Sequence, residues 1–243
     1  MSELQNLELT DPGTVLAIAA HPDDLEYGAA AAVAIWTDAG HPVSYTLVTS
    51  GEAGIDGIGP DECASLREAE EVAGAALVGV SDVEFLGHRD GTIEYGLALR
   101  RDLAAAIRRH KPDTLLLFNH REGWGFPGSL NSPDHRAVGQ AALEAMGDAG
   151  NRWIFPELDL EPHSAKRALV TGSPLSTHGL DVTVGLDRAI ASLAEHRAYL
   201  EGLGDHPMSD PEFLRANAEQ TALRLPGAAP GSAALAFEVF GTV

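Results

Sequence analysis

The chain has 243 residues, of which 44% are hydrophobic and 21% are charged, as expected for a folded globular protein rather than a disordered one. Its 36 acidic residues outnumber its 16 lysines and arginines, which gives a formal net charge of −20. A surface this acidic repels phosphate backbones and anionic lipids, so we expect neither a nucleic-acid-binding protein nor a membrane-surface protein.

Short apolar runs alternate with helical patterns over the first 150 residues. In chain order, this alternation predicts a strand at residues 14–20, a helix at 26–39, a strand at 43–49, a glycine-rich loop at 51–59, a helix at 62–77 capped by Asp61, a strand at 83–86, a helix at 97–110, a strand at 114–118 and, after a long loop, a helix at 134–146. Buried apolar strands separated by helices favour a parallel sheet covered by helices on both faces. We therefore predict an α/β fold, Rossmann-like and doubly wound, with a mostly parallel sheet.

Residues 151–243 have a less regular pattern. We expect strands at 168–171 and 180–184, a helix at 186–200, a capping box at Ser209-Asp210-Pro211-Glu212 that opens a further helix, a linker-like segment at 227–234 and a last strand at 235–240. No internal repeat or domain boundary is visible in the sequence. We expect a single domain over residues 1–243, with its Rossmann-like core at about residues 14–150.

Cysteine usage and the N-terminal residues bear on the cellular compartment. Cys63 is the single cysteine, so one chain can form neither a disulfide bond nor a thiolate zinc site. The N-terminal residues show no basic segment followed by an apolar run, and no stretch approaches the about 20 apolar residues of a transmembrane helix. We expect a cytoplasmic protein without a membrane partner; the oligomeric state stays open, with a homo-oligomer as one option.

Two strand ends have residues that suit metal chemistry. His21-Pro22-Asp23-Asp24-Leu25-Glu26-Tyr27-Gly28 directly follows the first strand, where a dinucleotide-binding protein would have a glycine-rich phosphate loop. The long loop after the fourth strand leads into Ser132-Pro133-Asp134-His135. Ligands of open α/β sheets bind outside the carboxyl ends of the strands. Carboxylates at that place repel a phosphate and attract a divalent cation.

The spacing of these residues suits a catalytic metal. His21 and Asp24 are three residues apart in a tight turn and can point at one centre, and His135 can complete a set of two histidines and one carboxylate. Catalytic zinc uses about three protein ligands and leaves a position open for water. Asp23 is then the spare carboxylate beside that water, and it is a candidate general base.

Glu26 and Asp134 are candidates to orient the two imidazoles. The alternative interpretation is a polar turn that caps the following helix. A cap accounts for one aspartate, but it does not account for a histidine and two aspartates at the end of a buried strand. The metal interpretation is therefore preferred.

The motifs resemble those of a known family. Residues 20–28, A-H-P-D-D-L-E-Y-G, resemble the A-H-P-D-D-x-E signature of the PIG-L/LmbE-like de-N-acetylases, and Ser132-Pro133-Asp134-His135 is similar to the later H-P-D-H element. Ser50-Gly51-Glu52, Arg67-Glu68 with Glu70, and Leu86-Gly87-His88-Arg89-Asp90-Gly91 resemble the intervening elements. The resemblance runs from about residue 14 to residue 135 and more faintly beyond. It implies a Rossmann-like zinc enzyme that removes the acetyl group from N-acetylated amino sugars.

Carried over by position, the resemblance implies that His21, Asp24 and His135 bind Zn²⁺, although the donor set also suits other divalent metals, and that Asp23 is the base. One position departs from the family pattern, because Ser132 stands where the first histidine of H-P-D-H is expected. In relatives that histidine helps polarise the substrate carbonyl, so another group must take its place.

Arg67 and Asp90 stand at family positions that contact the sugar, and the resemblance implies a substrate-binding role for both. For Arg67, a helix-surface ion pair with Glu70 or Glu71 is an equally good interpretation. The glycines between residues 51 and 59 are interpreted as an active-site loop rather than a phosphate cradle, because acidic residues lie among them.

A substitute for the missing imidazole is sought in the loop at residues 119–131. Ser132 is too short to replace an imidazole from the same backbone position without a shift or a bridging water. His120 is the one imidazole of the loop and leaves the fourth strand at the correct edge of the sheet. We therefore predict that His120 is catalytic, as the oxyanion or leaving-group partner. Alternatively, His120 only braces the loop by bonding to backbone.

These residues together predict a zinc-dependent hydrolase that removes an N-acyl group, most simply N-acetyl, from an amino sugar in a small glycoconjugate. One alternative is an amidase of another small-molecule amide, such as a thiol conjugate, which would use the same metal ligands. The other is a non-catalytic metal- or sugar-binding protein on the same fold. Ser132 favours the non-catalytic alternative, whereas a retained base at Asp23 counts against it.

Overall fold

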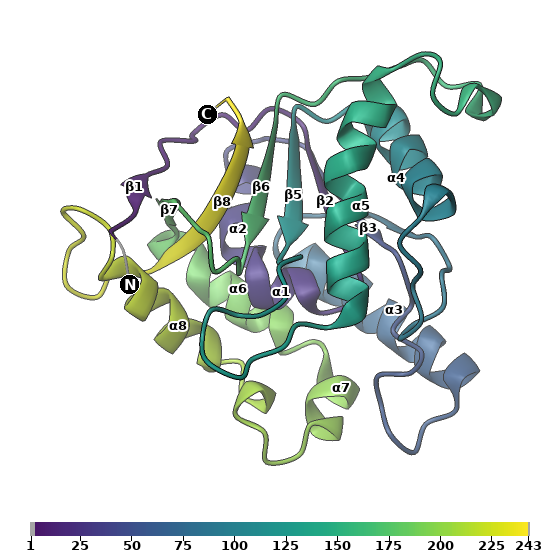
Figure 1. The fold of residues 1–243 in the computed structure, drawn as a ribbon. Coiled ribbons are helices and arrows are strands. Elements are labelled where there is room, and N and C mark those ends of the chain that lie inside the picture. Colours follow the sequence, from purple (N-terminus) through teal and green to yellow (C-terminus); the bar gives the residue numbers. More distant parts are fainter. Residues whose placement is uncertain (1–2, 243) are drawn as a thin grey trace.

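One eight-stranded sheet organises the computed structural model, which describes residues 3–242 (Figure 1). The strand order is β1-β7-β8-β6-β5-β2-β3-β4, with β1 at Gln5–Asn6, β2 at Val15–Ala19, β3 at Val43–Leu47, β4 at Asp82–Phe85, β5 at Thr114–Phe118, β6 at Arg167–Thr171, β7 at His178–Asp181 and β8 at Ala234–Gly241. β8 pairs antiparallel with β6 and β7, and the other neighbouring strands pair parallel. The predicted α/β fold with a mostly parallel sheet is confirmed.

Helices cover both faces of the sheet (Figure 1). The helix bounds are α1 Asp24–Gly28, α2 Ala30–Asp38, α3 Pro60–Leu77, α4 Leu97–His110, α5 Pro133–Gly150, α6 Leu186–Leu193, α7 Arg197–Gly202 and α8 Phe213–Ala222. One apolar core lies under α4 and α5, and a second core lies between the opposite face and α2, α6 and α8. No helix of the described residues is long and apolar enough to cross a membrane.

The central strands place the two motifs at one edge of the sheet. β2 and β5 pair in parallel with Val15 opposite Thr114, and both strands are almost entirely buried. Because they run in the same direction, the segments that follow Ala19 and Phe118 leave the sheet at the same end. Figure 1 shows α1 and the loop from β5 to α5 at that end.

Two predicted helices are each divided in two. The predicted helix at residues 26–39 is interrupted at Ala29, whose φ of −140° is not helical, and so forms α1 and α2. At this break the Gly28 carbonyl accepts a 2.6 Å hydrogen bond from Thr171 Oγ1, so a strand partner replaces a helical one. The predicted helix at residues 186–200 is likewise interrupted between Leu193 and Arg197, where the side chain of His196 is fully buried.

Both predicted helix caps are wrong. α3 begins at Pro60 after Gly59, so Asp61 lies within the first turn, where its charge favours the helix dipole without capping it. The predicted capping box does not form either, because Asp210 Oδ1 accepts from the Glu212 N–H at 3.0 Å and α8 begins one residue later. β7 also starts and ends earlier than predicted, and the two-residue strand β1 was too short and too exposed to show an apolar pattern.

Candidate active site and metal centre

A cavity of about 430 Å³ lies where β2 and β5 end. Both motifs contribute to its wall, together with residues from α3, α7 and the loop after β5. The charged and aromatic residues that line it are His21, Asp23, Asp24, Tyr27, Arg67, Asp90, Phe118, Trp124, Asp134, His135 and Tyr199. The structure therefore brings together all the predicted site residues except His120 and Glu26.

Three potential ligand atoms converge in the wall of this cavity. His21 Nδ1 lies 3.2 Å from His135 Nε2, and His135 Nε2 lies 3.0 Å from Asp24 Oδ1. His21 Nδ1 lies 3.6 Å from the other carboxylate oxygen of Asp24, Oδ2. Tetrahedral zinc with bonds of about 2.0–2.1 Å requires ligand atoms about 3.3 Å apart. The described atoms already have this spacing, so the donor set fits a tetrahedral metal ion.

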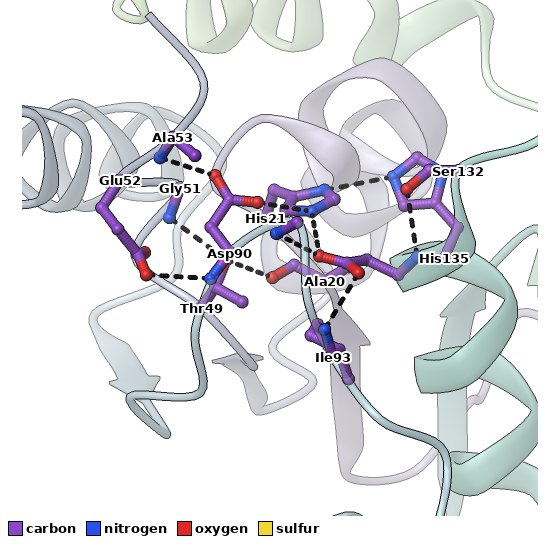
Figure 2. Close-up of polar contacts among 12 residues, drawn as sticks. Ala20, His21, Thr49, Gly51, Glu52, Ala53, Asp90, Ile93, Ser132 and His135 are labelled. Atoms are coloured by element: carbon purple, nitrogen blue, oxygen red, sulfur yellow. Dashed lines mark hydrogen bonds and ion pairs between the residues drawn. The ribbon is translucent and has the colours of Figure 1, made fainter. Parts of the chain in front are cut away.

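Hydrogen bonds to neighbouring side chains fix the orientation of the two candidate histidine ligands. Figure 2 shows His21 between His135 and Asp90. His21 Nε2 lies 3.1 Å from Asp90 Oδ1 and 3.3 Å from Asp134 Oδ2, which favours a proton on Nε2 and leaves Nδ1 free for a metal. His135 Nδ1 lies 2.8 Å from Asn131 Oδ1, and this contact likewise directs Nε2 toward the centre.

The charges around the centre favour a cation. Burial by itself lowers the pKa of His21, but Asp134, Asp24 and Asp90 outweigh burial and raise that pKa well above its usual range. Burial raises the pKa of Asp24, but the adjacent imidazoles outweigh it and hold that pKa far below its usual range. A surplus of carboxylates around two imidazoles is the environment that a divalent cation would neutralise.

Asp23 has an unusual backbone and a buried carboxyl group. Its φ of +91° lies in the left-handed region, which non-glycine residues adopt only when their surroundings hold them there. Asp23 is 4% exposed, and Oδ2 lies 3.3 Å from a guanidinium nitrogen of Arg67. Burial raises the pKa of Asp23 to about 6, although Arg67 opposes the shift. A carboxyl group with this proton affinity suits general acid–base chemistry near neutral pH.

Arg67 faces Asp23 and not the solvent, so the predicted alternative of a helix-surface ion pair is wrong. The side chain is buried, donates to the carbonyls of Gly51 and Pro22, and stacks 4.4 Å from the centroid of the Tyr199 ring. A Cβ atom on Gly51 would lie 2.3 Å from Arg67 Nη1, and one on Gly54 equally close. Gly51 and Gly54 therefore make room for the close approach of Arg67.

A family model described as "PIG-L: GlcNAc-PI de-N-acetylase" matches residues 16–146, which is more than half of the chain. The chain belongs to the PIG-L family. The predicted family resemblance is thereby confirmed.

Curated members of the PIG-L family resemble parts of the chain. A probable N-acetyl-alpha-D-glucosaminyl L-malate deacetylase 2 of Bacillus anthracis is 30% identical over 54% of this chain and 58% of its own length. A diacetylchitobiose deacetylase of Thermococcus kodakarensis is 32% identical over 65% of this chain and 60% of its own length. The matched part of the chain thus spans less than two thirds of either relative.

A solved structure extends the likeness of fold to nearly the whole chain. The N,N'-diacetylchitobiose deacetylase from Pyrococcus horikoshii superposes with a TM-score of 0.82 over 97% of this chain and 87% of that protein, at 24% identity. At this identity the comparison supports the common architecture of the PIG-L fold, including the part after residue 146.

Ser132 takes the place of the first histidine of the PIG-L motif and has a structural contact there. Its Oγ accepts a 3.1 Å hydrogen bond from the Asp134 N–H and caps α5. Ser132 also lines the cavity, so a hydroxyl group stands where the family motif has an imidazole. The carboxylate of Asp134 contacts His21 Nε2 and accepts hydrogen bonds from the backbone N–H groups of Gly91 and Ile93.

His120 lies outside the cavity of this PIG-L protein. It packs under α5, where a Cβ atom on Gly139 would lie 2.5 Å from His120 Cβ, and its ring centroid is 6.4 Å from that of Phe240. Its Nδ1 is buried without a hydrogen-bond partner among the described residues. The structure gives His120 no contact with the ligands, and its predicted catalytic role stays a prediction.

Asp90 contacts the candidate metal ligand His21, and its other carboxylate oxygen accepts from the Ala53 N–H at 2.9 Å. Its predicted contact with the sugar stays a prediction. Glu26, which was expected to orient an imidazole of the site, points elsewhere, toward Ser192 and His196.

Sequence reasoning did not identify three residues that support the site: Asn131, Glu71 and Tyr199. Asn131 stands four residues before His135, one helical turn away, and this spacing was the available signal. Glu71 stands four residues after Arg67 on the same helix face, which suggested Arg67 as its partner and gave no signal for its contact with the Asp23 N–H. Tyr199 lies far along the chain and reaches the cavity only through the packing of α7.

Proposed function

We propose that the chain is a zinc-dependent hydrolase that removes the N-acetyl group from an amino sugar, free or in a small glycoconjugate. The observation on which the proposal rests is the convergence of His21, Asp24 and His135 at one point of the cavity, with the carboxyl group of Asp23 beside them. The names of the two curated relatives support an N-acetylated glucosamine unit as the substrate class.

The proposed metal ligands are His21 Nδ1, His135 Nε2 and a carboxylate oxygen of Asp24. The 3.2 Å between the two nitrogens, and the 3.0 Å and 3.6 Å from these nitrogens to the two oxygens of Asp24, support tetrahedral zinc with a fourth position for substrate or water. When bound, zinc would supply Lewis acidity toward the attacking water and the acyl carbonyl.

Asp23 is the proposed general base and acid. Its carboxylate takes one proton from the water that attacks the acyl carbon, and it returns that proton to the amide nitrogen as the C–N bond breaks. Acetate and the free amino sugar are the products. Arg67, 3.3 Å away, keeps the carboxyl group in one orientation and limits the rise of its pKa.

The remaining wall of the cavity suits an uncharged sugar. Trp124, Tyr27 and Tyr199 offer aromatic surfaces on which a sugar ring can stack. Among the described residues that line the cavity, Arg67 is the one lysine or arginine. Its two terminal nitrogens already contact Asp23 and two carbonyls, and its Nε is buried away from the cavity surface. An anionic group on the substrate would therefore find no free fixed cation in this wall, and we propose a neutral substrate.

A mass-spectrometric screen with zinc-loaded protein tests the proposal. The panel contains N-acetylglucosamine, N,N'-diacetylchitobiose, an N-acetylglucosamine conjugate with a carboxylate aglycone, and an N-acylated thiol conjugate. We expect loss of one acetyl group from a neutral sugar, and no such loss with the Asp23→Asn variant. Turnover of the thiol conjugate alone would favour the other amidase, and binding without turnover of any compound would favour a non-catalytic protein.

A further inference from the structure

A buried polar cluster lies directly behind Asp23. It consists of Glu26 from α1, Glu71 from α3 and His196 at the start of α7, and none of the three is more than 1% exposed. His196 Nε2 lies 3.5 Å from Glu26 Oε2 and 3.7 Å from Glu71 Oε2. These residues take no part in the proposed reaction, so the cluster needs a separate explanation.

Glu71 connects this cluster to the proposed base. Its Oε2 accepts a 2.9 Å hydrogen bond from the backbone N–H of Asp23. This is the residue whose φ of +91° lies in the left-handed region. A non-glycine residue keeps such a backbone only where its surroundings determine it, and such residues concentrate at functional sites. The carboxylate of Glu71 is one such determinant, because it holds the N–H group that this conformation turns into the protein.

Helix α3 contacts Asp23 at a second point. Arg67, four residues before Glu71 and on the same helix face, reaches the Asp23 carboxyl group at 3.3 Å. One helix therefore fixes the backbone of Asp23 through Glu71 and its side chain through Arg67.

Close packing fixes Glu71 itself. Gly74, on the next turn of α3, allows residues 192–196 to approach, because a Cβ atom there would lie 3.0 Å from the Ser192 carbonyl oxygen and 3.2 Å from His196 Nε2. Ser192 Oγ donates to the Gly74 carbonyl at 2.7 Å and to Glu26 Oε1 at 3.3 Å. The cluster is thus held from α1, α3 and α6, and Glu71 has little room to move.

We propose that Glu71 is a positioning residue for the deacetylation, which holds the backbone of Asp23 so that its carboxyl group faces the attacking water. This inference rests on the function proposed above. The length of the Glu71 side chain and its acceptor oxygen perform this role, and a negative charge on Glu71 is not required.

Two substitutions of Glu71 distinguish the effect of side-chain length from the effect of charge. Glu71→Gln keeps the length and one acceptor oxygen but removes the charge, whereas Glu71→Asp keeps the charge and shortens the side chain by one methylene. We expect Glu71→Gln to retain kcat, and we expect Glu71→Asp to lose about 10-fold to 100-fold in kcat, as for a catalytic group displaced by about 1 Å. The KM and the zinc content of both variants should match those of the wild type.

A second measurement does not depend on turnover. Hydrogen–deuterium exchange of the Asp23 amide should stay slow in Glu71→Gln and become faster in Glu71→Asp. Ser192→Ala is the matched control, because the Ser192 hydroxyl bonds to Glu26 and the Gly74 carbonyl but to neither Glu71 nor Asp23. It should change neither kcat nor this exchange rate.

The inference is overturned if kcat follows charge, with Glu71→Asp active and Glu71→Gln inactive, or if both folded variants keep the wild-type kcat. An unchanged exchange rate of the Asp23 amide in Glu71→Asp would also overturn it, whatever the kinetics. If the wild-type protein hydrolyses no N-acetylated sugar, the proposed function fails, and the exchange measurement still decides whether Glu71 holds Asp23.

Discussion

Replacement of Asn131 by alanine is expected to weaken metal binding although Asn131 is not a metal ligand. Asn131 is 4% exposed, and its side chain makes four hydrogen bonds. Oδ1 accepts from His135 Nδ1 at 2.8 Å and from the Ser132 N–H at 2.9 Å. Nδ2 donates to the carbonyls of Asn119 at 2.6 Å and Arg121 at 3.0 Å. Oδ1 thus orients the candidate metal ligand His135, and Nδ2 stabilises the loop at residues 119–131.

Loss of a hydrogen-bonding partner of a metal-bound histidine typically lowers metal affinity by about 10-fold to 100-fold. This range corresponds to about 1.4–2.7 kcal/mol of binding free energy. Each buried carbonyl left without its donor costs about 1–3 kcal/mol of folding stability. Asn131→Asp separates the two effects, because it keeps an acceptor for His135 and removes both donors. We expect it to lose stability but to retain zinc affinity.

Competition with a chromophoric chelator measures the zinc affinity, and urea denaturation of the zinc-loaded protein measures the stability. Ser129→Ala is the control in the same loop, since Ser129 bonds to the Trp124 N–H and the Phe126 carbonyl and not to His135. Wild-type zinc affinity in a folded Asn131→Ala protein would refute the reasoning, because His135 would then need no such partner.

Three further predictions concern other parts of the molecule. Asp24→Ala should lose most of the zinc that elemental analysis finds in the wild type, because it removes one of three ligands; full occupancy would contradict the ligand set. His120→Ala should keep the wild-type kcat and zinc content in steady-state assays, because the side chain lies outside the cavity; a selective loss of kcat would instead support its sequence-based role. Arg108→Met should lower the free energy of unfolding by about 3 kcal/mol or more in urea denaturation, because the buried guanidinium donates to five carbonyls between residues 148 and 155; a change below about 1 kcal/mol would show that water replaces those bonds.

The regular elements of the core could be predicted because their causes are local. Apolar runs mark β2 and β5, and a run rich in β-branched and aromatic residues marks β3. The spacing of leucines and isoleucine predicts α4 with the bounds Leu97–His110 that the structure has. The breaks at Ala29 and before Arg197 could not be predicted in this way. The first coincides with the bond between Thr171 and the Gly28 carbonyl, and the second with the burial of His196, and both partners are distant in sequence.

The residues of the candidate site likewise fall into those that a local motif predicts and those that only distant packing brings into place. The ligand candidates stand in two short motifs whose strands run parallel and adjacent, so a sequence pattern is enough to bring them together. Glu71 is 48 positions from Asp23, and its contact depends on how α3 packs behind the site. The prediction for His120 rested on the edge of the sheet at which β5 ends, and that edge does not determine on which side of the strand end the side chain points; in the structure it packs under α5.

The turnover of zinc-loaded Asp23→Asn, compared with the wild type at equal zinc occupancy, tests the central claim most directly. The amide of asparagine has nearly the shape of the carboxyl group but cannot accept the proton of the attacking water. We predict full zinc occupancy and a kcat about 10²-fold to 10⁴-fold lower than that of the wild type for release of acetate from a neutral N-acetylated sugar. A fully loaded Asp23→Asn protein that releases acetate at the wild-type rate would contradict the account.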